Sequence, residues 1–94
     1  MGSWLVRRRL THIATRLRKL RDELAVVDEQ LAHLRDDAED LAVRAVVAES
    51  PAASVESNDA RKHVDAMLRH RQHVMAEITE LELRQDELLD QLTG

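Results

Sequence analysis

One pattern restricts the fold of this chain more than any other: apolar residues recur alternately three and four positions apart along two long stretches. This spacing places the residues of each stretch on one face of an α-helix, in the heptad pattern of a coiled coil. The first stripe consists of Leu10, Ile13, Leu17, Leu20, Leu24, Val27, Leu31, Leu34, Ala38, Leu41, Ala45 and Ala48. The second consists of Val64, Met67, Arg71, Val74, Ile78, Leu81, Gln85, Leu88 and Leu92. We therefore expect two long helices that pack along these stripes.

The two stripes are separated by helix-breaking and helix-capping residues around Pro51. A residue before proline is disfavoured in helical geometry, and Ser, Asn and Asp side chains cap new helices. The sequence predicts a first helix over 10–49, a turn over 50–58 and a second helix over 59–93. Residues 1–9 are predicted to project past the end of the second helix as a basic overhang, helical or partly disordered. The candidate caps of the second helix are Ser57, Asn58 and Asp59.

The short connection returns the chain antiparallel, so the expected fold is all-α, an antiparallel two-helix coiled-coil hairpin. Alignment of the stripes about the predicted turn pairs residues whose numbers sum to about 105. Arg71 then lies opposite Leu34 with Asp37 within reach, and Gln85 lies opposite Leu20. Polar residues inside a coiled-coil seam commonly fix its register. We assign that role to Arg71 and Gln85.

Further apolar residues lie outside the two stripes and predict contacts beyond a single hairpin. Three of them flank the second stripe and widen it toward the pattern of a bundle helix: Leu68, Met75 and Leu89. They predict a homodimer in which two hairpins form a four-helix bundle. Four valines near the turn predict an apolar tip that binds a partner: Val43, Val46, Val47 and Val55.

Positive charge is concentrated at the start of the chain. Residues 1–21 carry seven Lys or Arg and no acid, although the net charge is −4. These cations could pair with the acidic end of the second helix, through pairs such as Arg21–Glu82 and Arg16–Glu87. They could instead bind nucleic-acid phosphates through residues 7–21. A third interpretation is a contact with a protein partner or a membrane surface through Trp4, Arg7, Arg8 and Arg9.

Composition argues against catalysis. The chain has no Cys, its single aromatic residue is Trp4, and both glycines lie at the termini. Thiolate chemistry and a Gly-rich phosphate loop are therefore excluded, and a two-helix rod offers no concave ligand cavity. His70, His73 and Glu77 share one helical stretch but are interpreted as surface residues. The acidic run is interpreted as a solvated face: Asp36, Asp37, Glu39 and Asp40. We expect no enzyme activity, no cofactor and no metal.

No apolar run approaches the ~20 residues that a membrane-spanning helix needs, so we expect a cytoplasmic protein. The pattern predicts a non-enzymatic coiled-coil adaptor, scaffold or regulatory subunit. It would bind a protein partner through its basic N-terminal end and its apolar tip. The alternative is a nucleic-acid-associated regulator, for example of transcription, whose basic end contacts phosphates.

Overall fold

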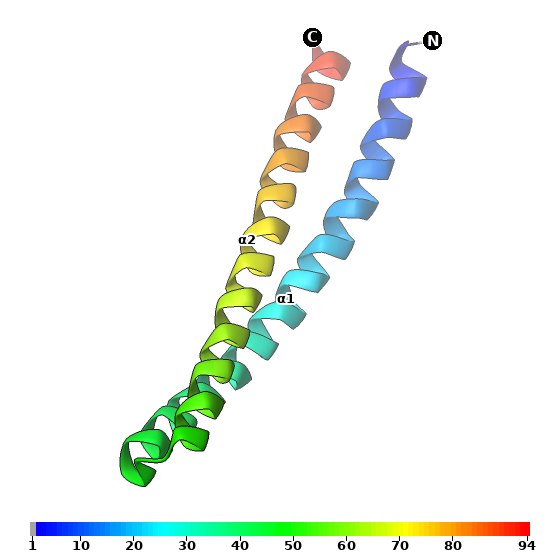
Figure 1. Ribbon diagram of the computed structural model, residues 1–94. Helices are drawn as coiled ribbons and strands as arrows, with labels where there is room; N and C mark the ends of the chain where they lie inside the picture. Colours follow the sequence, from blue (N-terminus) through cyan, green and yellow to red (C-terminus); the bar gives the residue numbers. More distant parts are fainter. Residues whose placement is uncertain (1) are drawn as a thin grey trace. The chain divides into compact units, whose positions relative to one another are not determined.

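The computed structural model describes residues 2–94, which form two α-helices joined by a tight turn (Figure 1). Helix α1 spans Gly2–Ala48 and helix α2 spans Pro51–Thr93. The described residues contain no strand, and the helices return on each other, which confirms the predicted all-α hairpin. The chain divides into two compact units. The terminal unit comprises, of the described chain, residues 2–24 and 73–94; the turn unit comprises Ala25–Gln72.

The turn consists of Glu49 and Ser50 alone. Glu49 has a left-handed backbone conformation with a φ of 51°, and its amide donates to the carbonyl of Ala45 at 3.2 Å, which ends α1. Ser50 Oγ accepts a hydrogen bond from the amide of Ala53 at 3.2 Å and so caps α2. Pro51 is the first residue of α2, where the absence of an amide proton costs nothing.

The predicted turn over 50–58 and the predicted start of the second helix at residue 59 are therefore wrong. Ser57 lies within α2 with a half-buried side chain, and Asn58 Oδ1 accepts a hydrogen bond from Arg61 Nη2 at 2.9 Å. Neither residue begins a helix. The error comes from Pro51, because a proline that disfavours helix before it is also well suited to the first turn of the helix that follows.

The core of the terminal unit begins earlier in the chain than predicted. Val6 is only 9% exposed and lies in one cluster with Ile13, Leu17 and Leu88. Partly buried residues packed against this cluster are Leu10, Ile78 and Leu81. Residues 2–9 are thus the first turns of α1, packed beside the end of α2 (Figure 1), rather than an overhang beyond it. The short turn explains the difference, because it adds residues to α2.

The apolar stripe continues through the turn unit, and small residues take over its positions close to the turn. Val27 and Leu31 are each 4% exposed. Toward the turn, the stripe positions of α1 become half-buried: Leu34, Ala38, Leu41 and Ala45. On α2 the same three–four spacing precedes Val64 as half-buried Ala53, Ser57 and Ala60. These small residues extend the seam to the turn, over the segment that the sequence predicted to be irregular.

Arg71 shows the register of the two helices in the turn unit. Its Nε donates a hydrogen bond to Asp28 Oδ1 at 2.5 Å. The predicted neighbours, Leu34 and Asp37, lie between one and three turns further along α1, so the predicted register is wrong by about one heptad. A shift by one heptad again sets stripe against stripe. The stripes therefore fit both registers, and the length of the turn selects between them.

Candidate interaction surfaces

The start of α1 carries an exposed tryptophan among arginines. Trp4 is 62% exposed, and the guanidinium carbon of Arg8 lies 5.7 Å from the centroid of its ring, within the range of a cation–π contact. Arg7 donates to the carbonyl oxygen and the hydroxyl of Ser3, each at 3.3 Å. Arg9 is exposed as well. Two of the three arginines are therefore held against their own helix while their charges stay in solvent.

Further along, two cations of α1 are neutralised by acids of α2. Arg16 Nη2 lies 2.7 Å from Glu77 Oε2, and Arg21 Nη2 lies 3.4 Å from Glu82 Oε2. The Arg21–Glu82 pair confirms the predicted one. All four side chains are about half exposed, so each pair contributes only ~0.2–1 kcal/mol.

The predicted Arg16–Glu87 pair is wrong, because Glu87 instead pairs with Arg84 of its own helix at 3.1 Å. Internal pairing therefore accounts for only part of the basic start. Among residues 2–21, five cations are exposed and form no ion pair within the described chain: Arg7, Arg8, Arg9, Arg18 and Lys19. These charges are available to a partner.

The four valines near the turn do not form one surface. Val43, Val46 and Val47 are 64%, 76% and 79% exposed and follow the i, i+3, i+4 spacing of a single helical face. This face points away from α2, because Val43 lies between the half-buried seam positions on either side of it. Val55, 59% exposed, lies on the outer face of α2, away from α1. We call Val43, Val46 and Val47 the valine cluster.

An acidic patch precedes the valine cluster on the same outer face of α1. Asp36, Glu39 and Asp40 stand at i, i+3 and i+4, and Val43 continues the same row. All three carboxylates are exposed and form no ion pair within the described chain. The sequence alone predicts a solvated face for these acids. Their spacing relative to the valines is the signal that joins the two groups into one surface.

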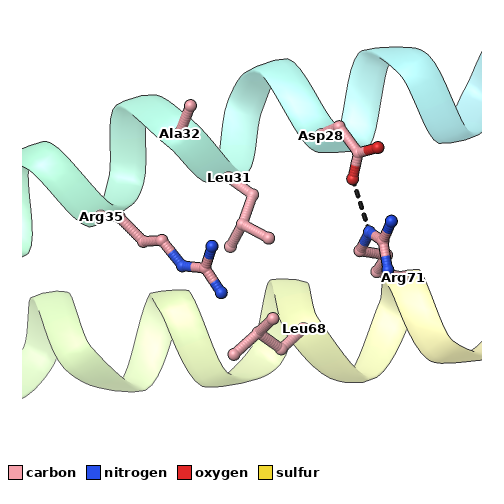
Figure 2. A pocket seen from close by; sticks show the side chains of 6 residues that line it. All are labelled: Asp28, Leu31, Ala32, Arg35, Leu68 and Arg71. Carbon is pink, nitrogen blue, oxygen red and sulfur yellow. Dashed lines mark hydrogen bonds and ion pairs between the residues drawn. The ribbon is translucent and has the colours of Figure 1, made fainter.

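Arg71 lies in an open groove between the helices of the turn unit (Figure 2). Its hydrogen bond to Asp28, and then the negative charge of that carboxylate, raise the pKa of Arg71 above its ordinary value. Leu31, Ala32, Arg35 and Leu68 complete the lining, and the Arg35 side chain reaches from α1 toward the groove. Arg71 is thus a cross-helix partner of α1. Its role in fixing the register stays a prediction. Gln85 is half-buried in the terminal unit.

The predicted oligomerisation residues differ in exposure. Leu68 is half-buried in the turn unit, where it lines the groove beside Arg71. Met75 and Leu89 belong to the terminal unit and are 42% and 45% exposed. Each of these side chains exposes a smaller fraction than any residue of the valine cluster. A bundle interface through this row stays a prediction.

Within residues 2–94, no three His, Cys, Asp or Glu side chains are grouped closely enough to hold a metal ion. None of the described helices is both long and apolar enough to cross a membrane. Comparisons with protein-family models, curated proteins and solved structures each found no match for the chain.

Proposed function

We propose that this chain is a non-enzymatic coiled-coil adaptor, scaffold or regulatory subunit of the cytoplasm that binds a protein partner through the outer face of α1. The valine cluster carries the proposal. Its three side chains are 64–79% exposed and adjacent on one helix. Contiguous exposed apolar surface of this kind is typical of interaction sites on soluble proteins.

The basic start of α1 supplies a second surface of the proposed contact. Trp4 is 62% exposed, and Trp and Arg are the residue types that dominate binding energy at protein interfaces. Positive charge near a helix N-terminus also opposes the helix dipole. An acidic partner would offset that cost, which supports a role in binding for Arg7, Arg8 and Arg9.

The proposal is tested by cross-linking in cells of the source organism. A photo-activatable residue at position 54, which is exposed and caps no helix, would report on partners near the turn. One at position 3 would report on partners near the basic start. Replacement of all three residues of the valine cluster by Ser is expected to abolish the cross-links near the turn. The combined change Arg7→Glu, Arg8→Glu and Arg9→Glu is expected to abolish the cross-links near the basic start. The matched control is Val55→Ser, because Val55 is equally apolar but lies on α2. Cross-links that survive all of these changes would contradict the proposal.

A nucleic-acid-associated regulator is the second candidate function. The observation in its favour is the set of exposed cations that pair with no acid of the described chain, above all Arg9, Arg18 and Lys19. If these residues neutralise phosphates, affinity for duplex DNA or RNA must fall steeply between about 50 and 200 mM salt. The acidic remainder of the chain opposes such binding. An affinity that does not depend on salt would refute this candidate.

A further inference from the structure

We propose that the protein partner of the outer face of α1 is a second copy of this chain. In this pair, the basic start of one copy binds the acidic patch and valine cluster of the other. The inference rests on the proposed function, because it names the partner of the surfaces described there. It is independent of the bundle interface predicted through Leu68, Met75 and Leu89.

Exposed charges of both signs lie on α1 without an ion-pair partner among residues 2–94. In the terminal unit, the outer face of α1 presents Arg8, Arg18 and Lys19 with no acid before residue 22. In the turn unit, the outer face presents the acidic patch. The ion pairs within residues 2–94 include neither group. Each copy therefore carries both a positive surface and a negative surface of matching size.

The order of residue types along α1 also favours a second copy as the partner. From the N-terminus, the terminal unit presents exposed Trp4 and Leu5 first and the basic residues after them. The turn unit presents the acidic patch first and the valine cluster after it. The two orders are mirror images. An antiparallel contact between the two segments consequently sets apolar residues against apolar residues and cations against carboxylates.

The lengths of the two segments differ by about 5 Å, a distance that a long arginine side chain can cover. At 1.5 Å per residue, Trp4 to Arg18 spans about 21 Å and Asp36 to Val47 spans about 16 Å. With Trp4 opposite Val47, Arg8 lies about 4.5 Å along the axis from the level of Asp40, and Arg18 lies the same distance from the level of Asp36. The long arginine side chains can cover these offsets.

A stable contact between proteins requires a minimum buried area. Specific interfaces bury at least ~1,200 Å² in total, more than three valines and one tryptophan supply once. Because each copy carries both surfaces, a two-fold symmetric pair forms the contact twice. The doubled contact includes both apolar groups and both charged groups of each copy. A second copy therefore covers both surfaces of α1, whereas a partner that binds only one of them would leave the other exposed.

The test is the mass of the purified full-length chain, measured by light scattering during size exclusion. We expect the wild type at twice the 10.8 kDa of one chain. One variant reverses the basic residues, through Arg8→Glu, Arg18→Glu and Lys19→Glu. The other reverses the acidic patch, through Asp36→Lys, Glu39→Lys and Asp40→Lys. Each variant alone is expected at the mass of one chain, because like charges then face each other. An equal mixture of the two variants is expected to recover the doubled mass.

The controls separate this surface from general effects of charge. Exposed acids on the outer face of α2 are reversed through Asp65→Lys, Glu80→Lys and Asp86→Lys, which change the net charge as much as the acidic-patch variant does. This control is expected to keep the doubled mass. Val46→Ser with Val47→Ser is expected to weaken the pair at least tenfold, whereas Val55→Ser leaves it unchanged. Far-UV circular dichroism confirms that each variant remains helical.

Three results would overturn the inference. The first is a wild type that stays at the mass of one chain at about 1 mM, the weak end of specific association. The second is a doubled mass that persists in both charge variants. The third is two dissociated variants that fail to associate when mixed. A wild type of single mass whose cellular cross-links still depend on the valine cluster refutes this inference alone. Cross-links that are unchanged by the variants of both the valine cluster and the basic start refute the proposed function as well.

Discussion

The capping of α2 by Ser50 leads to the sharpest prediction about stability. Ser50→Ala removes the hydroxyl that accepts the amide proton of Ala53 at 3.2 Å, while the backbone of the turn stays as it is. Loss of an N-cap side chain costs about 1 kcal/mol within a range of about 0.5–2 kcal/mol. Chemical denaturation should therefore show a free energy of unfolding lower by about 1 kcal/mol.

In thermal unfolding the same loss corresponds to a midpoint lower by about 4–8 °C for a domain of this size. Protein concentration must be held constant between variants, because any association stabilises the folded chain by mass action. Unfolding is followed by circular dichroism at 222 nm, a wavelength that reports helix directly. A denaturant midpoint that falls with an unchanged slope identifies a change in stability rather than in the unfolded state.

Two other serines test whether α2 begins directly after Ser50. Ser54 is exposed one turn into α2, and Ser57 is half-buried in the seam, so neither caps a helix. Ser→Ala at Ser54 should be neutral or stabilising by up to about 0.5 kcal/mol, because Ala has the higher helix propensity. If α2 instead began near residue 59, Ser57→Ala would carry the loss. Equal effects at Ser50 and Ser54, or a larger effect at Ser57, would refute the short turn.

The remaining predictions concern the turn, the core and one ion pair. Glu49→Gly should raise the free energy of unfolding by about 0.5–1 kcal/mol in a urea titration, because Gly adopts the left-handed conformation without strain but gains entropy when unfolded. Leu88→Ala should lower the free energy of unfolding by about 2–5 kcal/mol, because removal of this fully buried side chain leaves a cavity. Leu83→Ala should change it by less than about 0.5 kcal/mol, because Leu83 is 60% exposed. Similar losses in the two variants would contradict the burial of Leu88. Asp28→Asn should lower the free energy of unfolding by no more than about 1 kcal/mol at low salt and by less at high salt, because the ion pair with Arg71 is partly exposed. A loss that does not depend on salt would exclude an ionic contribution of this pair.

Much of the fold follows from the apolar stripes alone. Leu17 and Leu20 on α1 and Leu88 on α2 are at most 1% exposed, and all three were assigned to the seam from spacing. Spacing is informative here because only one face of each helix can be buried against the other. Exposure elsewhere in the stripes rises where the residues become smaller or approach an end, as at Leu92, which is 38% exposed.

The register could not be obtained in the same way. A heptad seam looks the same after a shift of one heptad, so the stripes do not distinguish Asp28 from Asp37 as the neighbour of Arg71. The turn selects the register, and its signal was the dipeptide Ser50–Pro51, an N-cap followed by a first helical residue. The cluster of polar residues after Pro51 concealed this signal, because Ala53 and Ser57 are too small to be recognised as seam positions.

The sequence identified the exposed residues of the candidate surfaces, but it did not show which of them lie together on one surface. Exposure of Val43, Val46 and Val47 follows from their positions outside the stripe, whereas their separation from Val55 requires the second helix to run from Pro51. A turn of several residues would have left the orientation of Val55 undetermined. Once α2 is helical from its first residue, Val55 must point away from the seam formed by Ala53 and Ser57.

The concentration of cations at the start of an acidic chain has two physical explanations that act together. Arg16 and Arg21 face α2 and neutralise Glu77 and Glu82, which would otherwise repel one another within a turn and a half of the same helix. Cations on the outer face, such as Arg18, have no such partner among the residues that the structure describes. Because side chains on opposite faces of a helix cannot share one partner, pairing inside the hairpin leaves the outer charges available for a contact between molecules.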